Sequence, residues 1–465
     1  MKKAISFMAS LAVAGSLTAF GADPFECSAI RAVTIVEEGT YELGDGSSVD
    51  YQVTDSDELI IKKYNGTAAE VEIPSEINGK KVNSISGVAF RNCTAMTSVT
   101  IPDSVSEIVG GAFQGCTGLT SVTIPDSIQY ISDGTFKDCT ALKSVTLPES
   151  LKYISFNAFE NCTELDSINI PENIENIYSD AFKNTKWYDD QPDGLVIAGN
   201  VLYKYKGTMP ENTSVDIPDN VRVIAYNAFE NCTGMTSVTI PEGVKDIGSD
   251  AFSGCTGLTS VTIPGTVPMI GYAAFSGCTG LTSLTLSEGV ENIQNGAFDG
   301  CTALSSVKLP DSLRIICSYA FGNCTSLTEV SIPEGTEYIM NNAFTGCSNL
   351  TKVTIPRIKE QNEGVDTIEK DVFLNCSKDL TIYGYKGTLA ERYAKENGIK
   401  FSALDAAAAQ KTTTTTAGGK KASTSTTKAK GDSPKTGDRG IGGFAAAGAA
   451  AAILALAAYR KRKVQ

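Results

Sequence analysis

The chain has 465 residues and no histidine, which excludes Ser-His and Cys-His catalysis and metal sites built on imidazole. It carries 39 basic and 53 acidic residues for a net charge of −14, and the part from Ala22 to Phe401 alone reaches −24. Because a surface this acidic repels polyanions, we expect no nucleic-acid partner.

The first 21 residues have the layout of a secretory signal peptide. Lys2 and Lys3 precede an apolar run, and small residues then lead to a predicted cleavage after Gly21. The alternative is a retained anchor helix, although the apolar run is short for a bilayer. Residues 22–72 contain alternating runs, DYQVT and ELIIKKY, broken by Gly and Asp. They predict an N-terminal β cap that covers the edge of the next element.

Residues 73–387 form a repeat with a period of 23 residues. The phrase CTGLTSVTIP occurs unchanged at 116–125 and 255–264. A gap of 47 residues from Phe182 to Phe229 holds one coil that has lost the pattern. The periodic phenylalanines, usually preceded by Ala, are Phe90, Phe113, Phe136, Phe159, Phe182, Phe229, Phe252, Phe275, Phe298, Phe321, Phe344 and Phe373.

A single coil shows what the repeat encodes. Leu119, Val122 and Ile124 predict a strand that ends at Pro125, since proline cannot donate to a sheet. Further apolar residues follow at short intervals down to Cys139. One coil cannot bury these side chains alone, so we expect the coils to stack into a mostly β solenoid.

Two segments depart from the repeat. Residues 183–216 hold the only tryptophan, Trp187, and two β-prone runs around Gly199 that predict a hairpin. Trp187 is either a ligand platform or, as is more common, a plug that fills the core where the repeat fails. Residues 356–366 carry extra charged residues and predict a protruding loop.

Residues 388–401 predict a short helix that caps the last coil. Thr388 and Glu391 have the spacing of a capping box, and Asn397-Gly398 is expected to end the helix. Residues 402–432 consist mainly of Ala, Thr, Ser and Lys. They have too few apolar side chains to fold, which fits a linker.

The pattern L-x-x-V-x-I-P-x-x-I-x-x-I-x-x-x-A-F-x-x-C resembles the BspA-like (Treponema-type) leucine-rich repeat family, from about Val71 to Leu380. The resemblance implies a leucine-rich repeat solenoid, secretion or surface display, and no enzymatic activity. Members of this family are described mainly as adhesins or as proteins of unknown role.

Residues 433–465 resemble the sortase sorting signal of Gram-positive bacteria, whose usual pentapeptide is Leu-Pro-x-Thr-Gly. An uncharged span at 441–459 and a basic tail follow the pentapeptide. The resemblance implies that a sortase transpeptidase cleaves the pentapeptide between its last two residues and transfers the chain to peptidoglycan. The span would contact the membrane only before cleavage, and the alternative is a permanent transmembrane anchor. The pentapeptide here is Ser433, Pro434, Lys435, Thr436 and Gly437, with serine in place of leucine.

Eleven of the 13 cysteines share one repeat position, which Thr185 takes in one coil. Disulfides between coils are an alternative in a secreted protein, but parallel side chains about 4.8 Å apart suit them poorly. We expect buried thiols, and no metal or cofactor, because no C-x-x-C and no calcium-loop spacing occurs. The ladder cysteines are Cys93, Cys116, Cys139, Cys162, Cys232, Cys255, Cys278, Cys301, Cys324, Cys347 and Cys376.

Outward-facing aromatic residues are the candidate ligand-binding residues. Tyr130 and Tyr153 both lie six residues before the phenylalanine of their coil, so stacking places their rings about 5 Å apart. Phe156, Tyr226 and Tyr272 each lie three residues before theirs. Large exposed aromatics are enriched at binding anchors. The alternative is that these rings lie flat over apolar atoms of the solenoid, which would leave the Ser/Thr-rich strand face as the binding candidate.

The sequence therefore predicts a secreted surface protein, attached to the cell wall of a Gram-positive bacterium, that adheres to a host, matrix or glycan partner. A passive structural spacer of the cell envelope is the alternative. An enzyme is not predicted, because no pair of carboxylates is singled out at a set separation in a cleft.

Overall fold

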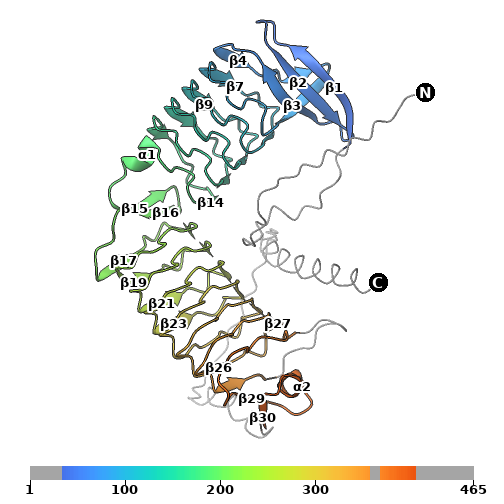
Figure 1. The fold of residues 1–465 in the computed structure, drawn as a ribbon. Coiled ribbons are helices and arrows are strands. Elements are labelled where there is room, and N and C mark those ends of the chain that lie inside the picture. Colours follow the sequence, from blue (N-terminus) through green and yellow to red (C-terminus); the bar gives the residue numbers. More distant parts are fainter. Residues whose placement is uncertain (1–33, 357–366, 405–465) are drawn as a thin grey trace, which may run out of the picture. The chain divides into compact units, whose positions relative to one another are not determined.

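The structure is a computed structural model that describes residues 34–356 and 367–404. In these ranges the regular secondary structure is almost entirely β, with only two short helices, and the short strands follow one another along the coils of a solenoid (Figure 1). The expected mostly β repeat fold is confirmed. The signal peptide, the loop at 357–366, the linker and the sorting signal lie outside the described residues.

An N-terminal sheet covers the start of the solenoid, as predicted. Strands β1, β2 and β3 pair antiparallel, and β3 continues in parallel onto β6. Alternate side chains of β2 are buried, at Val49, Tyr51 and Val53, so this sheet closes the hydrophobic core. The strands are β1 (Ile35–Glu42), β2 (Ser48–Thr54), β3 (Leu59–Asn65), β5 (Glu76–Ile77) and β6 (Lys80–Ile85).

Most coils contribute two short strands, each of which pairs in parallel with its equivalent in the neighbouring coils. The first ladder consists of β4 (Glu70–Glu72), β7 (Ser98–Thr100), β9 (Ser121–Thr123), β11 (Ser144–Thr146), β13 (Ser167–Ile168), β17 (Thr213–Asp216), β19 (Met235–Thr239), β21 (Ser260–Ile263), β23 (Ser283–Leu286), β26 (Glu329–Ser331), β28 (Lys352–Thr354), β29 (Thr381–Gly384) and β30 (Lys400–Ala403). After β6, the second ladder consists of β8 (Glu107–Ile108), β10 (Tyr130–Ile131), β12 (Tyr153–Ile154), β14 (Asn176–Ile177), β18 (Val223–Ile224), β20 (Asp246–Ile247), β22 (Met269–Ile270), β24 (Asn292–Ile293), β25 (Ile315–Ile316) and β27 (Tyr338–Ile339).

Aromatic rings stacked along the solenoid fill the interior of the coils. Neighbouring periodic phenylalanines lie 4.8 to 5.6 Å apart between ring centroids, and their planes differ by at most 19°. Tyr64 extends the stack into the N-terminal sheet, 5.5 Å from Phe90. Ten of the twelve phenylalanine N–H groups also donate to a backbone carbonyl of the next coil, as from Phe159 to Ala181 at 2.8 Å. The phrase repeats because each coil meets the same packing problem.

The residue before each ladder cysteine has a left-handed backbone. Its φ lies between 52° and 74° in all the coils from Asn92 to Asn375. Glycine, asparagine and aspartate tolerate this conformation, and only these three residue types occur there. The recurring Asn-Cys-Thr triplets therefore reflect backbone geometry.

The irregular coil replaces its first-ladder strand with the helix α1 (Lys186–Asp189) and then forms a hairpin. The Thr185 hydroxyl caps α1 by accepting the Tyr188 N–H at 3.2 Å. Trp187 is half-buried with its ring 4.6 Å from that of Phe182, so it packs against the phenylalanine stack where the regular coils stop. The hairpin strands are β15 (Gly194–Ala198) and β16 (Val201–Lys206).

The first three residues of strand β16 are buried, and the strand contributes side chains to two hydrophobic cores. On one face, Tyr205 takes the place of the missing phenylalanine. Its N–H donates to the Ala228 carbonyl at 2.7 Å, as the N–H of a periodic phenylalanine does to the next coil. On the other face, Tyr203 packs in the preceding core, and its hydroxyl accepts the Phe182 N–H at 3.1 Å. This burial explains why the run LVIAGNVLY does not alternate between polar and apolar residues.

Helix α2 (Leu389–Glu396) covers the last coil and confirms the predicted C-terminal cap. Tyr393 closes the phenylalanine stack, 6.0 Å from Phe373 with the rings edge to face. The predicted capping box is wrong in its partners. The Thr388 hydroxyl donates to the Tyr385 carbonyl at 2.6 Å, and Glu391 accepts a hydrogen bond from the backbone before the cap. The helix ends at Asn397, and Gly398 has a φ of 66°.

Candidate functional site

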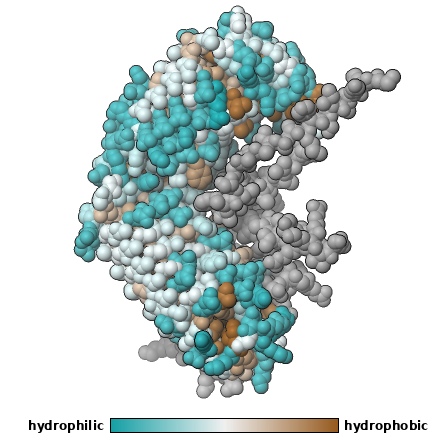
Figure 2. All heavy atoms as spheres, in the orientation of Figure 1, coloured by the Kyte–Doolittle hydropathy of each residue, from teal (hydrophilic) through white to brown (hydrophobic). Residues whose placement is uncertain are grey.

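The hydroxyl groups of the first ladder hold neighbouring coils together. The Thr120 hydroxyl donates to the Thr97 carbonyl at 3.0 Å, and Thr259 and Thr282 repeat this bond to the coil before them at 3.0 and 3.1 Å. The hydroxyls of the Ser/Thr-rich face therefore have in part a structural role, since these threonine hydroxyls bond to the backbone of the preceding coil. Figure 2 shows a surface that is hydrophilic or neutral over most of the coils, with only small hydrophobic areas.

The Tyr130 and Tyr153 rings lie side by side on the second ladder, as their register requires. Their centroids are 5.8 Å apart with the planes tilted by 47°, and both side chains are half-buried. The Tyr153 hydroxyl donates to Glu175 at 2.5 Å. This hydrogen bond orients the ring and leaves part of it open to solvent.

Phe156 belongs to a different aromatic cluster from the one expected. It packs on Tyr178 and Tyr226, with centroids 4.8 and 5.9 Å away, and Tyr178 and Tyr226 are 4.9 Å apart. This cluster connects the coils on the two sides of the irregular coil. Phe156 therefore packs against other aromatic rings of the solenoid and is not an isolated exposed ring. Sequence reasoning missed Tyr178, because it lies four residues before Phe182 instead of three. Tyr272, two coils beyond Tyr226, is half-buried.

A polar pair, the buried Asn176 and the partly buried Asp246, also links the two sides of the irregular coil. The Asn176 amide donates to the Asp246 carboxylate at 3.4 Å, across 70 residues of sequence. Burial raises the pKa of Asp246 to about 6, and a hydrogen bond from the Ile247 N–H opposes the rise. The Asn176 Oδ1 and Asn200 Oδ1 atoms are buried without a partner. The pair therefore costs stability, and the cost depends on pH.

The ladder thiols are free and point into the solenoid. Nine of the eleven donate to a phenylalanine carbonyl of the preceding coil, as Cys116 does to Phe90 at 3.0 Å. Burial raises the pKa of the Cys278 thiol to about 12, so the reactive thiolate is rare at neutral pH. Eight of the ladder cysteines are buried as predicted, whereas Cys93, Cys232 and Cys376 are half-buried.

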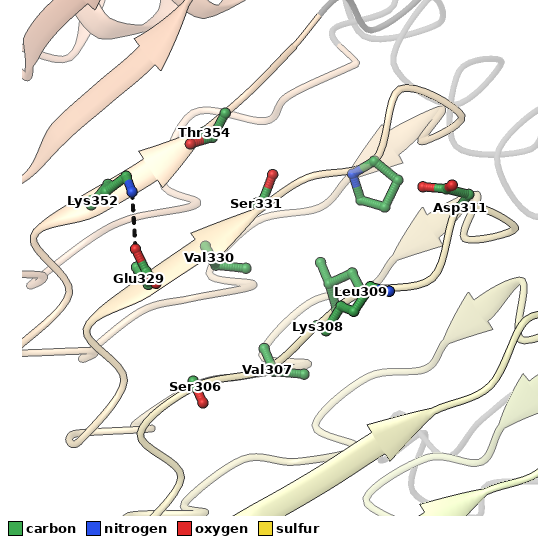
Figure 3. A pocket seen from close by; sticks show the side chains of 11 residues that line it. Ser306, Val307, Lys308, Leu309, Asp311, Glu329, Val330, Ser331, Lys352 and Thr354 are labelled. Carbon is green, nitrogen blue, oxygen red and sulfur yellow. Dashed lines mark hydrogen bonds and ion pairs between the residues drawn. The ribbon is translucent and has the colours of Figure 1, made fainter. Parts of the chain in front are cut away.

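A hollow of about 470 Å³ opens on the first ladder, over the segment 306–311 and the strands β26 and β28 that follow it (Figure 3). This segment pairs with its neighbours only through isolated bridges, Thr285 to Lys308 and Ser306 to Glu329. Lys352 pairs with Glu329 at 3.0 Å and lies 6.0 Å from the Tyr383 ring centre. Lys308 makes no ion pair with any residue of the described ranges.

Sequence reasoning missed this hollow. Its signal was the replacement of the usual serine of the strand by Glu329 and Lys352 in successive coils. The lining has both signs of charge, hydroxyl groups at Ser331 and Thr354, and a floor of Val307 and other apolar side chains. It can hold a small polar ligand by noncovalent contacts.

Within the residues that the structure describes, no group of three or more Asp, Glu or Cys side chains is arranged to hold a metal ion. Neither helix in these ranges has the length and hydrophobicity to span a membrane. The sortase-signal residues 433–437 and the apolar span 441–459 lie outside them.

A stack of short coils joined by parallel ladders and capped at both ends is a leucine-rich repeat architecture. The family model of the BspA type leucine-rich repeat region (six copies) matches residues 64–188, 203–301 and 268–386. These segments cover more than half of the chain, and the chain belongs to this family.

The chain is also similar to solved bacterial structures. A leucine-rich repeat protein from Bacteroides ovatus shares 24% identity over 81% of this chain and 100% of that chain, with a TM-score of 0.34. A leucine rich cell surface protein from Faecalibacterium prausnitzii shares 22% over 78% and 98%, with a TM-score of 0.30. The pneumococcal vaccine antigen PcpA shares 17% over 80% and 100%, with a TM-score of 0.36. Curated protein sequences gave no significant match.

Proposed function

We propose that this protein is displayed on the surface of a Gram-positive bacterium, attached to the cell wall through Thr436, and acts by adhesion to a protein or glycan partner. The observation that supports this most is the BspA type repeat, which matches from residue 64 to residue 386 with one interruption. Such a solenoid offers long faces of fixed geometry, which suits recognition of extended partners.

The half-buried Tyr130 and Tyr153 rings support binding over a passive role. Tyrosine provides a rigid contact surface with a polar tip, and it is enriched at binding hot spots. A spacer needs no aromatic pair at outward positions. The intercoil bonds of the first-ladder hydroxyls fit either role, so they do not discriminate between the two.

The test uses the native host in three forms: wild type, a deletion strain, and a strain that carries the Tyr130→Ala/Tyr153→Ala chain. Adherence to arrays of glycans and matrix proteins should be lost on deletion. It should fall in the double variant, while surface display measured by antibody stays unchanged. Equal adherence of the deletion strain and the wild type, together with a thinner cell envelope, would establish the spacer role instead.

A further inference from the structure

Tyr319 has a backbone conformation that is unfavourable for its side chain. The position two residues before the periodic phenylalanine is left-handed in ten coils, and Tyr319 has a φ of 58°. In this conformation the Cβ atom lies too close to the backbone carbonyl oxygen, which is a steric cost. Glycine has no Cβ, and asparagine and aspartate tolerate the conformation better than an aromatic residue does. Eight of these coils follow that rule with Gly111, Gly134, Asn157, Asp180, Asn227, Asp250, Gly296 and Asn342, and Ala273 is the other exception.

Packing does not explain the tyrosine either. The Tyr319 side chain is 45% exposed, and the same position holds Gly296 in the coil before and Asn342 in the coil after. The N–H at this position donates to the next coil in the four preceding coils, as from Gly296 to the Ser318 carbonyl at 2.9 Å, whereas Tyr319 does not make this bond within the described residues. A strained and exposed side chain that the fold does not require points to a function.

The neighbours of Tyr319 are rich in amides. The pairing of β24, β25 and β27 aligns Ile315 with Asn292 and Tyr338, so the residues after these strands lie side by side at strand spacing. The Ser318 N–H donates to the side-chain Oδ1 of Asn295 at 3.0 Å, which fixes that side chain beside the tyrosine loop.

Three side-chain amides lie on the loops that flank the Tyr319 loop, one in the coil before it and two in the coil after it. The Asn295 Nδ2 and the side-chain amides of Asn341 and Asn342 have no hydrogen-bond partner in the described part of the chain. The Asn341 N–H itself donates to Glu369 at 2.8 Å, which holds this loop in place next to Tyr319. An amide both donates and accepts, which suits hydroxyl groups.

We propose that Tyr319, with Asn295, Asn341 and Asn342, forms a binding site for a neutral saccharide. A pyranose ring has an apolar face that covers an exposed aromatic ring, and hydroxyls at its edge that pair with amides. A net charge of −24 over residues 22–401 disfavours acidic sugars. One ring flanked by Gly296 and Asn342 is too small an apolar area for a protein interface. This site rests on the proposed adhesive function and names its ligand class.

The test measures binding of the full-length chain to an array of neutral hexose and N-acetylhexosamine oligosaccharides, with affinities of the positives determined by calorimetry. Tyr319→Asn restores the residue type of the repeat. It should raise the thermal midpoint and weaken binding by about tenfold or more, the scale of a lost aromatic anchor. Ala273→Asn, two coils away at the same position, is the matched control and should raise the midpoint with unchanged affinity. Tyr319→Phe should keep most of the binding.

Three results would overturn the site: no neutral saccharide bound by the wild type, equal affinity of Tyr319→Asn and the wild type, or equal losses in Tyr319→Asn and Ala273→Asn. If Tyr319→Asn fails to fold, Tyr319→Gly replaces it, because glycine occurs at this position as often as asparagine does. Host adherence measured with the deletion strain separates the two ideas. A strain that loses adherence while the purified chain binds no saccharide leaves the adhesive role standing and removes only this site.

Discussion

At the scale of single residues, Asp246 on β20 lowers the stability of the folded protein at neutral pH. Its carboxylate is partly removed from water beside Asn176, and burial raises its pKa from 3.8 to about 6. The folded protein therefore holds the proton more tightly than the unfolded chain does. The stability cost is fully present above pH 6, falls as the pH drops through 6, and disappears below about pH 4.

Asp246→Asn should remove this cost and keep the hydrogen bond from Asn176. The variant should be more stable than the wild type by about 1–2 kcal/mol at pH 7.5, less than the full shift implies because the side chain keeps some contact with water. The difference should vanish near pH 4. Urea unfolding at both pH values measures it, with the exposed Asp216→Asn on β17 as the control that changes neither value. A stability difference independent of pH would contradict the assignment.

The ladder thiols act as small buried fillers that also donate a weak hydrogen bond. Cys278→Ala removes the sulfur and its bond to the Phe252 carbonyl at 3.2 Å, and should cost about 1–2 kcal/mol. Cys93→Ala, at a half-buried position, should cost less. Thiol counting with an alkylating reagent should find slow reaction in the native protein and free thiols throughout the ladder in denaturant. A single free thiol in denaturant would show that the ladder is bridged.

At the scale of elements, strand β16 of the hairpin packs against two cores, through Tyr203 on the preceding core and Tyr205 on the following one. Tyr203→Phe removes the hydroxyl that accepts the Phe182 N–H, leaves that donor buried without a partner, and should cost about 1–3 kcal/mol. Tyr205→Phe restores the residue of the regular coils at a site that faces the other core, and should be neutral or stabilising. Thermal unfolding of the two variants compares them directly. Equal effects would mean that the two faces of β16 are not distinct.

The structure of the regular coil could be predicted from the sequence. The same inward side chains recur every 23 residues, and their burial requires the coils to stack. Phe90 through Phe373, the ladder cysteines and the capping helix all belong to this predictable part. The second ladder was not readable, since a two-residue strand such as Tyr130–Ile131 carries no pattern of its own.

The candidate site was only partly readable, for a different reason. The register of Tyr130 and Tyr153 followed from the period, but the contact of Phe156 with Tyr226 spans 70 residues and depends on how the irregular coil packs. The hollow near Lys308 depends on lost strand pairing, and Tyr319 stands out only once its φ is known. The repeated positions predict how the coils pack. The contacts of residues that depart from the repeat can be found only from the three-dimensional structure.

At the scale of the whole molecule, the proposed adhesive role requires that the chain be held at the cell surface, and we propose that it is attached to the wall. The resemblance to a sorting signal predicts cleavage after Thr436, at residues outside the described ranges. Muramidase digestion of native host walls should release a chain whose last residue is Thr436, linked to a peptidoglycan fragment, as read by mass spectrometry. Thr436→Ala should instead leave the chain in the membrane fraction with Gln465 as its end, because the uncleaved span stays in the bilayer. Lys435→Ala, at the position that the signal leaves open, is the control and should be anchored normally. Recovery of the wild-type chain from membranes with Gln465 intact would replace wall attachment by a permanent transmembrane anchor.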